Sequence, residues 1–99
     1  LVGGLGMAPG SNFGTDTAIF EAVHGSAPDI AGMGMANPTS LMLAAAMMLS
    51  HVGLEKDAQR LRVAIDETLN TDNVRTRDLK GQASTLEFAD AVCQRLRAQ

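Results

Sequence analysis

The chain has 99 residues, 45% of them hydrophobic, and a formal net charge of −3. These values are typical of one small globular domain, and we expect no second domain within residues 1–99. All eight Lys and Arg residues lie from Lys56 onward, so the first 54 residues carry no permanent cation. Nucleic acids and acidic membranes bind through clustered basic residues, and both are therefore excluded as expected partners.

Three further features bound the class of protein. The chain opens on Leu1 rather than Met, without a basic leader or a cleavage site, so we expect it to be a piece of a longer protein. Its single cysteine, Cys93, has no second thiol to pair with, which favours a reduced compartment and a packing role. The longest apolar run, residues 41–49, is about half of the ~18 residues that span a bilayer, so we expect a buried helix.

The first part of the chain predicts short strands and turns. Leu1 and Val2 before two glycines resemble the end of a helix. Residues 5–14 predict a short strand, with turns at Pro9-Gly10 and near Asn12 to Gly14. Residues 17–24 are β-branched and apolar enough to predict a buried strand.

The strand leads into an irregular stretch from His24 to Pro38, which is rich in glycine and proline and contains apolar residues. A loop this long within a compact domain is usually disordered or functional, and the apolar segments that flank it favour an ordered binding loop. His24 at the end of the strand is as well explained by a bond to a neighbouring carbonyl as by a role in ligand binding.

Three helices follow the loop. Asn37 and Pro38 predict the start of an apolar helix that ends at a Gly53 cap, covered on several sides. An amphipathic pattern predicts a second helix from Leu54 to about Leu69. Residues 70–73 are a turn cluster, and residues 74–79 predict only a connecting loop. Ser84 and Glu87 form a capping box at the start of the last helix, whose packing residues are Phe88, Ala89, Val92 and Leu96.

Known catalytic motifs are absent from the sequence. A Rossmann fingerprint that begins at Gly4 would need glycine at position 9, which is Pro9, and there is no P-loop. Ser26 has His24 two residues away but no nucleophile elbow around it. The spacing of Asp, Glu and His residues matches no metal loop. From the residues alone we therefore predict a binding surface that is not a catalyst by itself.

Several segments together resemble one family. Residues 20–32 followed by Asn37-Pro38-Thr39 are similar to the cofactor loop of the β-decarboxylating dehydrogenases, the isocitrate and isopropylmalate dehydrogenase family. Residues 3–14 before the loop and Thr76-Arg77-Asp78-Leu79 after it resemble the flanking segments of that family in the same order, although Lys80-Gly81 replaces its more usual Gly-Gly. The resemblance extends over essentially all 99 residues.

The resemblance implies an α/β fold with a dinucleotide site of its own, outside the Rossmann class. Residues 1–99 would be the C-terminal part of the larger domain, a single partial domain with short strands, the cofactor loop and three helices. The resemblance implies eight cofactor-binding residues: His24, Gly25, Ser26, Ala27, Asp29, Ile30, Asn37 and Asp78. His24 and Asn37 would contact the adenine, residues 25–27 the adenosine and phosphates, and Asp29 the ribose hydroxyls. The side chain of Asn37 has a competing role, because it could instead cap the helix that follows.

Asp29 also bears on which dinucleotide is used. A carboxylate accepts hydrogen bonds from ribose hydroxyls but repels a 2′-phosphate, and no Lys or Arg lies near Asp29 in the sequence. NAD is therefore the expected cofactor. Together with it the resemblance implies Mg²⁺ or Mn²⁺, whose ligands, like the catalytic Tyr and Lys of the family, have no match in this chain.

Residues 74–79, with Arg77 where isopropylmalate and tartrate relatives often have proline, look most like NAD-dependent isocitrate dehydrogenases. The resemblance then implies oxidation and decarboxylation of isocitrate, a 2-hydroxy acid of the tricarboxylic acid cycle. The alternatives are 3-isopropylmalate or a tartrate or malate relative as substrate, or a non-catalytic regulatory subunit. We expect a homo-oligomer, such as a homodimer, in the cytoplasm, or in the mitochondrial matrix if the source is eukaryotic.

Overall fold

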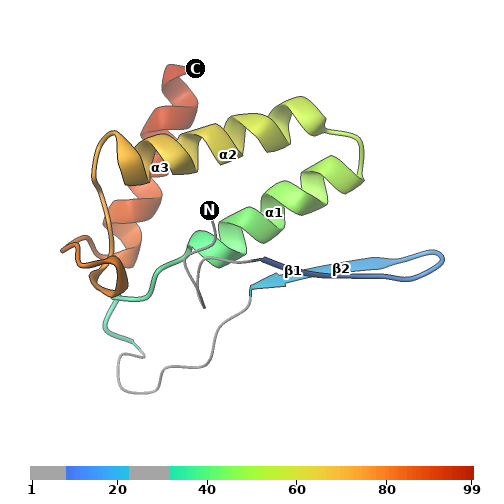
Figure 1. Cartoon of the computed structure of the whole chain (residues 1–99), viewed down its shortest axis with the longest axis horizontal. Helices are drawn as coiled ribbons and strands as arrows, with labels where there is room; N and C mark the ends of the chain where they lie inside the picture. The colour runs from blue at the N-terminus through green and yellow to red at the C-terminus, as the bar shows by residue number, and fades with distance from the viewer. Residues whose placement is uncertain (1–8, 23–31) are drawn as a thin grey trace.

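The chain folds as a β-hairpin against which a stack of helices is packed (Figure 1). The computed structural model describes residues 9–22 and 32–99. Their elements are β1 (Pro9–Phe13), β2 (Ala18–Ala22), α1 (Thr39–His51), α2 (Glu55–Asn70), a 3₁₀ turn (Arg77–Leu79) and α3 (Thr85–Ala98). Helix α1 contacts both strands, and α2 contacts α1 on one side and α3 on the other. The sequence prediction of an α/β arrangement with three helices is confirmed in these residues.

The hairpin corrects the predicted turns. Strands β1 and β2 are antiparallel and pair from Pro9 with Ala22 to Phe13 with Ala18, so Pro9-Gly10 begins a strand instead of making a turn. Proline is tolerated at the first residue of a strand, where pairing with the neighbouring strand outweighs its turn preference. The chain reverses between Gly14 and Thr17, just beyond the turn predicted near Asn12 to Gly14. There the N–H of Gly14 donates to the carbonyl of Thr17 at 2.6 Å.

Strand β2 is half exposed, and the prediction of a buried strand is wrong for the described chain. Its residues alternate between partly buried and exposed, and Ile19 keeps 59% of its surface exposed. Side chains of a strand point alternately to its two faces, and α1 lies on one face of this two-stranded sheet. The rings of Phe20 and His51 meet across that contact, with centroids 5.5 Å apart.

Helix α1 begins and ends close to the predicted positions. Its first helical residue is Thr39, directly after Pro38, and its C-terminal end is followed by Gly53 with a φ of +90°, a conformation that glycine adopts at little cost. Ala44 and Ala46 are fully covered, whereas Leu41 remains 60% exposed, so the predicted cover is present only on some sides. Among the described residues, no helix combines the length and the hydrophobicity that crossing a bilayer requires.

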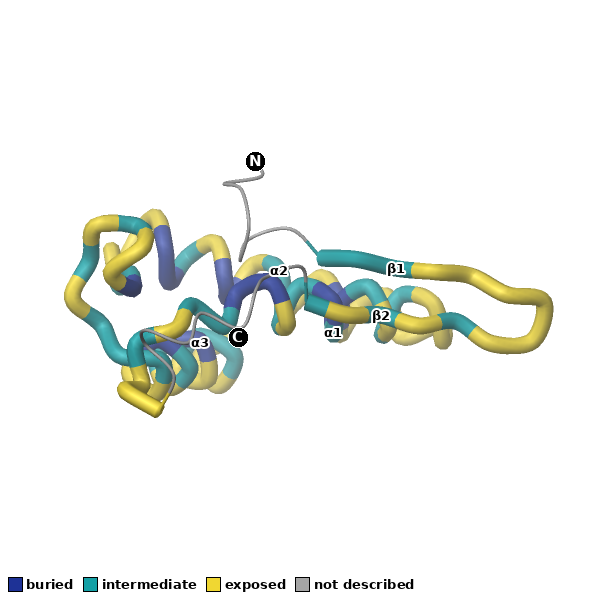
Figure 2. The backbone as a smooth tube through the Cα atoms, turned by 90° about the horizontal axis from the view of Figure 1, so that it is seen from below, coloured by how far each residue is buried: buried dark blue, intermediate teal, exposed yellow. Residues whose placement is uncertain are grey.

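The hydrophobic core lies between α2 and α3 (Figure 2). Its buried members are Ala64, Ile65, Leu69, Phe88 and Val92. The predicted stripe along α2 supplies Ile65 and Leu69, but Leu54, which precedes the helix, is 48% exposed. The predicted capping box at the start of α3 is present, because the side chains and backbone N–H groups of Ser84 and Glu87 bond reciprocally at 2.8 and 3.0 Å. It orients α3 so that Phe88 enters the core.

Cys93 is exposed, which corrects its predicted packing role. Each residue of an α-helix is rotated by about 100° from the previous one. Val92 faces the core at 2% exposure, so its neighbour in sequence points away from α2. The contact face of α3 is narrow because α2 is its main partner within the described chain.

Two arginines fasten the first part of the connection from α2 to α3, which spans residues 71–84. Arg75 donates from Nε to the carbonyl of Leu69 at 2.9 Å, which satisfies one of the last carbonyls of α2. Arg95 on α3 donates hydrogen bonds to both carboxylate oxygens of Asp72, from Nε at 2.9 Å and from Nη2 at 2.5 Å. This hydrogen bonding lowers the pKa of Asp72 and raises that of Arg95. The two contacts hold residues 71–76 along the ends of the two helices.

Candidate cofactor-binding loop

Two of the eight predicted cofactor residues lie in the described structure, and they are in contact. The amide Nδ2 of Asn37 donates to Oδ2 of Asp78 at 3.0 Å, although the residues are 41 positions apart in sequence. The other six, His24, Gly25, Ser26, Ala27, Asp29 and Ile30, lie outside the described residues. The loop from His24 to Pro38 is therefore described only from Gly32 onward.

The side chain of Asn37, the residue before the N-cap Pro38, bonds to the first residue of helix α1. Its Oδ1 accepts the backbone N–H of Thr39 at 2.9 Å and the hydroxyl of the same residue at 2.5 Å. A carboxamide oxygen has two lone pairs, and these two bonds use them. The capping role that competed with adenine recognition is thus present. Contact between Asn37 and adenine stays a prediction, and in this arrangement it does not use Oδ1.

Asp78 is oriented by the turn on which it lies. The 3₁₀ turn follows Thr76, a fully buried residue whose hydroxyl donates to Oδ1 of Asp78 at 2.5 Å. The carbonyl of Thr76 accepts the N–H groups of Leu79 and Gly81, both at 3.0 Å. A segment that the sequence described only as a connector is therefore a compact turn, which presents the Asp78 carboxylate to Asn37.

The backbone at the end of this turn disfavours Lys80, which stands where the family that the sequence resembles more usually has glycine. Lys80 has a φ of +64°, in the left-handed region that favours glycine. The family's more usual glycine at this position fits that backbone better than lysine does. Gly81 is required for another reason, because a Cβ built on it would lie 2.0 Å from the carbonyl oxygen of Arg75. The backbone passes too close there for any side chain.

The described limb of the loop, residues 32–38, lies against the start of α3. The N–H of Thr85 donates to the carbonyl of Gly34 at 2.8 Å. The hydroxyl of Thr85 donates to the carbonyl of Ala36 at 2.5 Å. Three segments far apart in sequence, the loop limb, the 3₁₀ turn and the first turn of α3, therefore meet at one end of the molecule.

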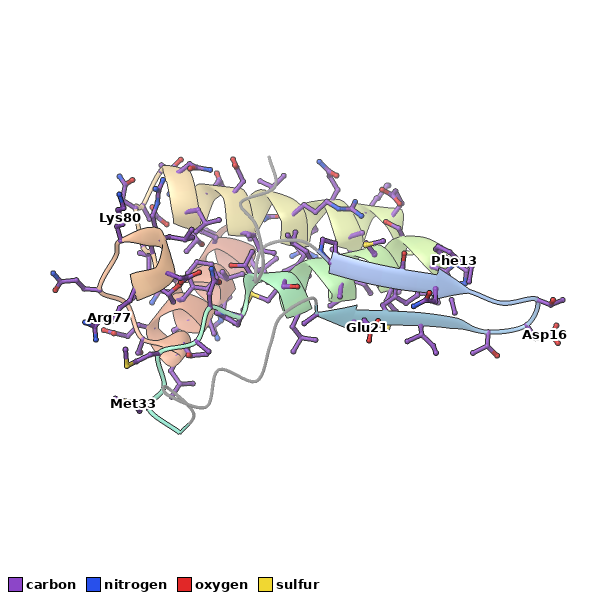
Figure 3. All side chains as sticks on the ribbon, turned by 60° about the horizontal axis from the view of Figure 1, so that its bottom comes forward. Phe13, Asp16, Glu21, Met33, Arg77 and Lys80 are labelled. Carbon is purple, nitrogen blue, oxygen red and sulfur yellow. The ribbon has the colours of Figure 1, made fainter. Side chains whose placement is uncertain are left out.

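Arg77 is a cation beside the loop that the sequence reasoning missed. Its Nη1 lies 4.0 Å from Sδ of Met35, 42 residues away in sequence. Figure 3 shows Arg77 and Met33 at one end of the molecule and Asp16 at the tip of the hairpin at the other. The first half of the chain has no Lys or Arg, so only folding brings a positive charge to this loop. No local sequence signal predicts a contact of this span.

The chemistry of these side chains fits a nucleoside better than a metal ion. Asp78 is exposed and offers carboxylate lone pairs, which accept hydrogen bonds from hydroxyl and amino groups. In the two described ranges, no group of three or more His, Cys, Asp or Glu side chains is placed to hold a metal ion. The residues present therefore fit part of a dinucleotide, and any divalent cation needs ligands other than these.

A hollow at the hairpin end of the molecule is separate from the described limb of the loop, residues 32–38. It has a volume of about 320 Å³ and is lined by Phe13, Phe20, Met47, Ser50, His51 and Arg62. The rings of Phe13 and Phe20 meet edge to face at 5.8 Å. Arg62 donates to the hydroxyl of Ser50 at 3.2 Å and pairs with Glu55 at 3.5 Å. Its charged group is thus already engaged within the chain.

Comparison with known proteins identifies the family. The family model described as isocitrate/isopropylmalate dehydrogenase matches residues 1–92. Over 98 residues the chain is 49% identical to subunit 2 of the mitochondrial NAD isocitrate dehydrogenase of Schizosaccharomyces pombe, an alignment that covers 98% of this chain and 26% of that protein. It is 50% identical to the 3-isopropylmalate dehydrogenase of Archaeoglobus fulgidus, over 97% of this chain and 29% of that protein.

The structural comparison agrees with the sequence comparison. The crystal structure of isocitrate dehydrogenase from Methylococcus capsulatus superposes with a TM-score of 0.90 and 47% identity, covering 96% of this chain and 29% of that one. The chain thus spans between 26% and 29% of the length of these relatives. Since the family model covers most of the chain and the fold is shared, the chain belongs to the isocitrate/isopropylmalate dehydrogenase family.

Proposed function

We propose that this chain is the adenosine-binding part of an NAD-dependent enzyme that oxidatively decarboxylates isocitrate to 2-oxoglutarate. The observation that carries the proposal is the bond between Asn37 and Asp78 at 3.0 Å, which joins two predicted cofactor residues across 41 positions of sequence. The NAD isocitrate dehydrogenase from Schizosaccharomyces pombe, at 49% identity, supports the choice of cofactor and substrate. In this proposal residues 1–99 are the C-terminal part of the large domain.

Each predicted residue has a physical role in binding. In this proposal Asp29 accepts hydrogen bonds from the adenosine ribose hydroxyls, His24 and Asn37 contact the adenine, and Ile30 is a further cofactor-binding residue. Residues 25–27 follow the adenosine and phosphates through their backbone. Asp78, held by Thr76, is a further acceptor at the adenosine end. NAD would supply the hydride acceptor for oxidation of the 2-hydroxyl group, and Mg²⁺ or Mn²⁺ would polarise the resulting ketone so that the carboxyl group on the neighbouring carbon can leave as CO₂.

The substrate is tested by assaying the full-length enzyme with isocitrate and 3-isopropylmalate in parallel. We expect a higher kcat/KM for isocitrate, with NAD reduction followed at equal cofactor concentration. Better turnover of isopropylmalate would favour the alternative, which the relative from Archaeoglobus fulgidus supports at 50% identity. Activity with neither acid, nor with tartrate or malate, combined with activation of a partner subunit, would instead identify a regulatory subunit.

The choice of cofactor is tested by changing the charge at the predicted ribose contact. We expect Asp29→Lys combined with Ile30→Tyr to shift the ratio of kcat/KM for NAD and NADP toward NADP by at least tenfold. Tenfold corresponds to ~1.4 kcal/mol, a modest share of the interaction between a carboxylate or an ammonium group and a 2′-phosphate. The measurement is steady-state kinetics of the full-length enzyme with each dinucleotide.

Asp16→Lys is the matched control for this double variant. It makes the same charge change at the exposed hairpin tip, at the far end of the molecule from Arg77 (Figure 3). Charges that far apart are screened by salt, so the control should leave the cofactor ratio unchanged. If the double variant left the ratio of kcat/KM for NAD and NADP unchanged, as this control should, the role proposed for Asp29 would be wrong.

The remaining proposals concern partners and location. We propose a small 2-hydroxy acid as substrate, a homo-oligomer such as a homodimer as the assembled enzyme, and neither nucleic acid nor membrane as partner. We also propose a place in the tricarboxylic acid cycle, in the cytoplasm or, in a eukaryote, in the mitochondrial matrix. The mitochondrial enzyme of Schizosaccharomyces pombe supports the second location. Size-exclusion chromatography with light scattering measures the oligomeric state of the full-length protein.

A further inference from the structure

The first residue of α3 is joined to the loop limb by two hydrogen bonds. Thr85 donates its backbone N–H to the carbonyl of Gly34 at 2.8 Å and its hydroxyl to the carbonyl of Ala36 at 2.5 Å. Both acceptors belong to the backbone, and they are two residues apart. The contact therefore fixes the path of the main chain through residues 34–36, independently of the side chains there.

The position of Thr85 in its helix leaves its donors available for this contact. The first N–H groups of a helix have no partner within the helix. The N–H of Glu87 is satisfied by the hydroxyl of Ser84 at 3.0 Å, and the N–H of Ser84 by the carboxylate of Glu87 at 2.8 Å. Thr85 lies between these two capping residues and bonds to the loop. Its β-branched side chain has few rotamers, so the hydroxyl is held in a narrow range of directions.

The helix that carries Thr85 is anchored in the core. Phe88 and Val92, one and two turns further along α3, are 0% and 2% exposed and pack against α2. At the other end of the limb, Asn37 bonds to Thr39 at the start of α1 and to Asp78 on the 3₁₀ turn. The limb is thus held at two points: by Thr85 on α3, and by the bonds of Asn37 to α1 and to the 3₁₀ turn.

We propose that Thr85 is a positioning residue for the dinucleotide. By holding residues 34–36 against α3, it fixes the main chain that leads directly to Asn37, and so keeps Asn37 beside Asp78 in the arrangement that receives the adenosine. The proposal rests on the function proposed above, since it assumes that the loop binds NAD. Thr85 itself need not touch the cofactor.

The test compares Thr85→Val with Thr85→Ser in the full-length enzyme. Valine keeps the shape and the backbone N–H but removes the hydroxyl, whereas serine keeps the hydroxyl. We expect Thr85→Val to raise the Kd for NAD about fivefold, or ~1 kcal/mol, the net value of one hydrogen bond. Thr85→Ser should restore the Kd to within twofold of the wild type. Thr71→Val is the matched control, an exposed threonine directly after α2.

Four readings separate positioning from general damage. The Kd for NAD is measured by calorimetric titration, KM for isocitrate and kcat by steady-state kinetics, and the unfolding midpoint by thermal denaturation. The proposal requires the Kd for NAD to rise while KM for isocitrate, kcat and the midpoint stay close to those of Thr71→Val. An unchanged Kd in Thr85→Val, or equal losses in all four readings, would overturn it. Failure of the wild-type enzyme to bind NAD would overturn the proposed function itself.

Discussion

Phe88→Ala is expected to lower the free energy of unfolding by about 3 to 5 kcal/mol, the range found when a buried aromatic ring is removed from a well-packed core. Phe88 has no exposed surface and packs with Ile65, Leu69 and Val92 between α2 and α3. Alanine would leave a cavity that the close-packed helices α2 and α3 can close only partly by relaxing. The midpoint of urea denaturation of the full-length protein, followed by circular dichroism, measures the loss.

Leu86→Ala is the control for that change. Leu86 is on the same helix, two residues earlier, but 74% of its surface is exposed in the described chain. Truncating an exposed side chain usually changes stability by no more than about 0.5 kcal/mol. Similar losses in the two variants would mean either that Phe88 is not a core residue or that Leu86 is covered by another part of the full-length protein.

Gly81→Ala should cost about 3 kcal/mol and should also weaken NAD binding. A Cβ on Gly81 would lie 2.0 Å from the carbonyl oxygen of Arg75 and 2.5 Å from its carbonyl carbon, so the backbone has to move. Thr76 links Gly81 to Asp78, because its carbonyl accepts the N–H of Gly81 and its hydroxyl donates to the Asp78 carboxylate. A shift of this turn therefore displaces the carboxylate that contacts Asn37. Urea denaturation and NAD titration of the same preparation measure the two effects.

Gly53→Ala separates the steric clash from backbone strain. Gly53 has a φ of +90°, but nothing lies within 4 Å of a Cβ built on it. Left-handed strain costs an ordinary residue roughly 1 to 2 kcal/mol, and the NAD affinity should not change. If Gly81→Ala were no more destabilising than this control and left the Kd for NAD unchanged, the tight turn would not be what holds Asp78.

Local sequence signals predicted the helices because their causes are local. The capping box of Ser84 and Glu87 and the glycine that ends α1 act over a few residues, and both are found in the structure. The strand ends were less predictable, because Pro9-Gly10 favours a turn in isolation and becomes a strand only by pairing with β2. Cys93 is exposed because α2 covers only one face of α3, and the sequence of α3 alone does not show which face another element will cover.

The sequence indicated candidate residues for the site but not their geometry. The resemblance to the dehydrogenase family indicated both Asn37 and Asp78, and the fold brings them to 3.0 Å from each other. Nothing in the spacing of 41 residues predicts that contact, nor the approach of Arg77 to Met35 or of Thr85 to Ala36. Such contacts depend on how the helices pack. The six predicted residues between His24 and Ile30 stay a sequence prediction.

The contact between Ala36 and Thr85 spans 49 residues, and this span has a consequence for the newly made protein. Chains are synthesised from the N-terminus at roughly 5 to 20 residues per second, so the loop limb precedes its anchor on α3 by roughly 2 to 10 s. Helix α1 can cap itself on Asn37 as soon as both have emerged, since Asn37 and Thr39 are two residues apart. The carbonyls of Gly34 and Ala36 meanwhile stay hydrated until α3 is complete and docked. The ability to bind NAD would then be among the last properties that this segment acquires during synthesis.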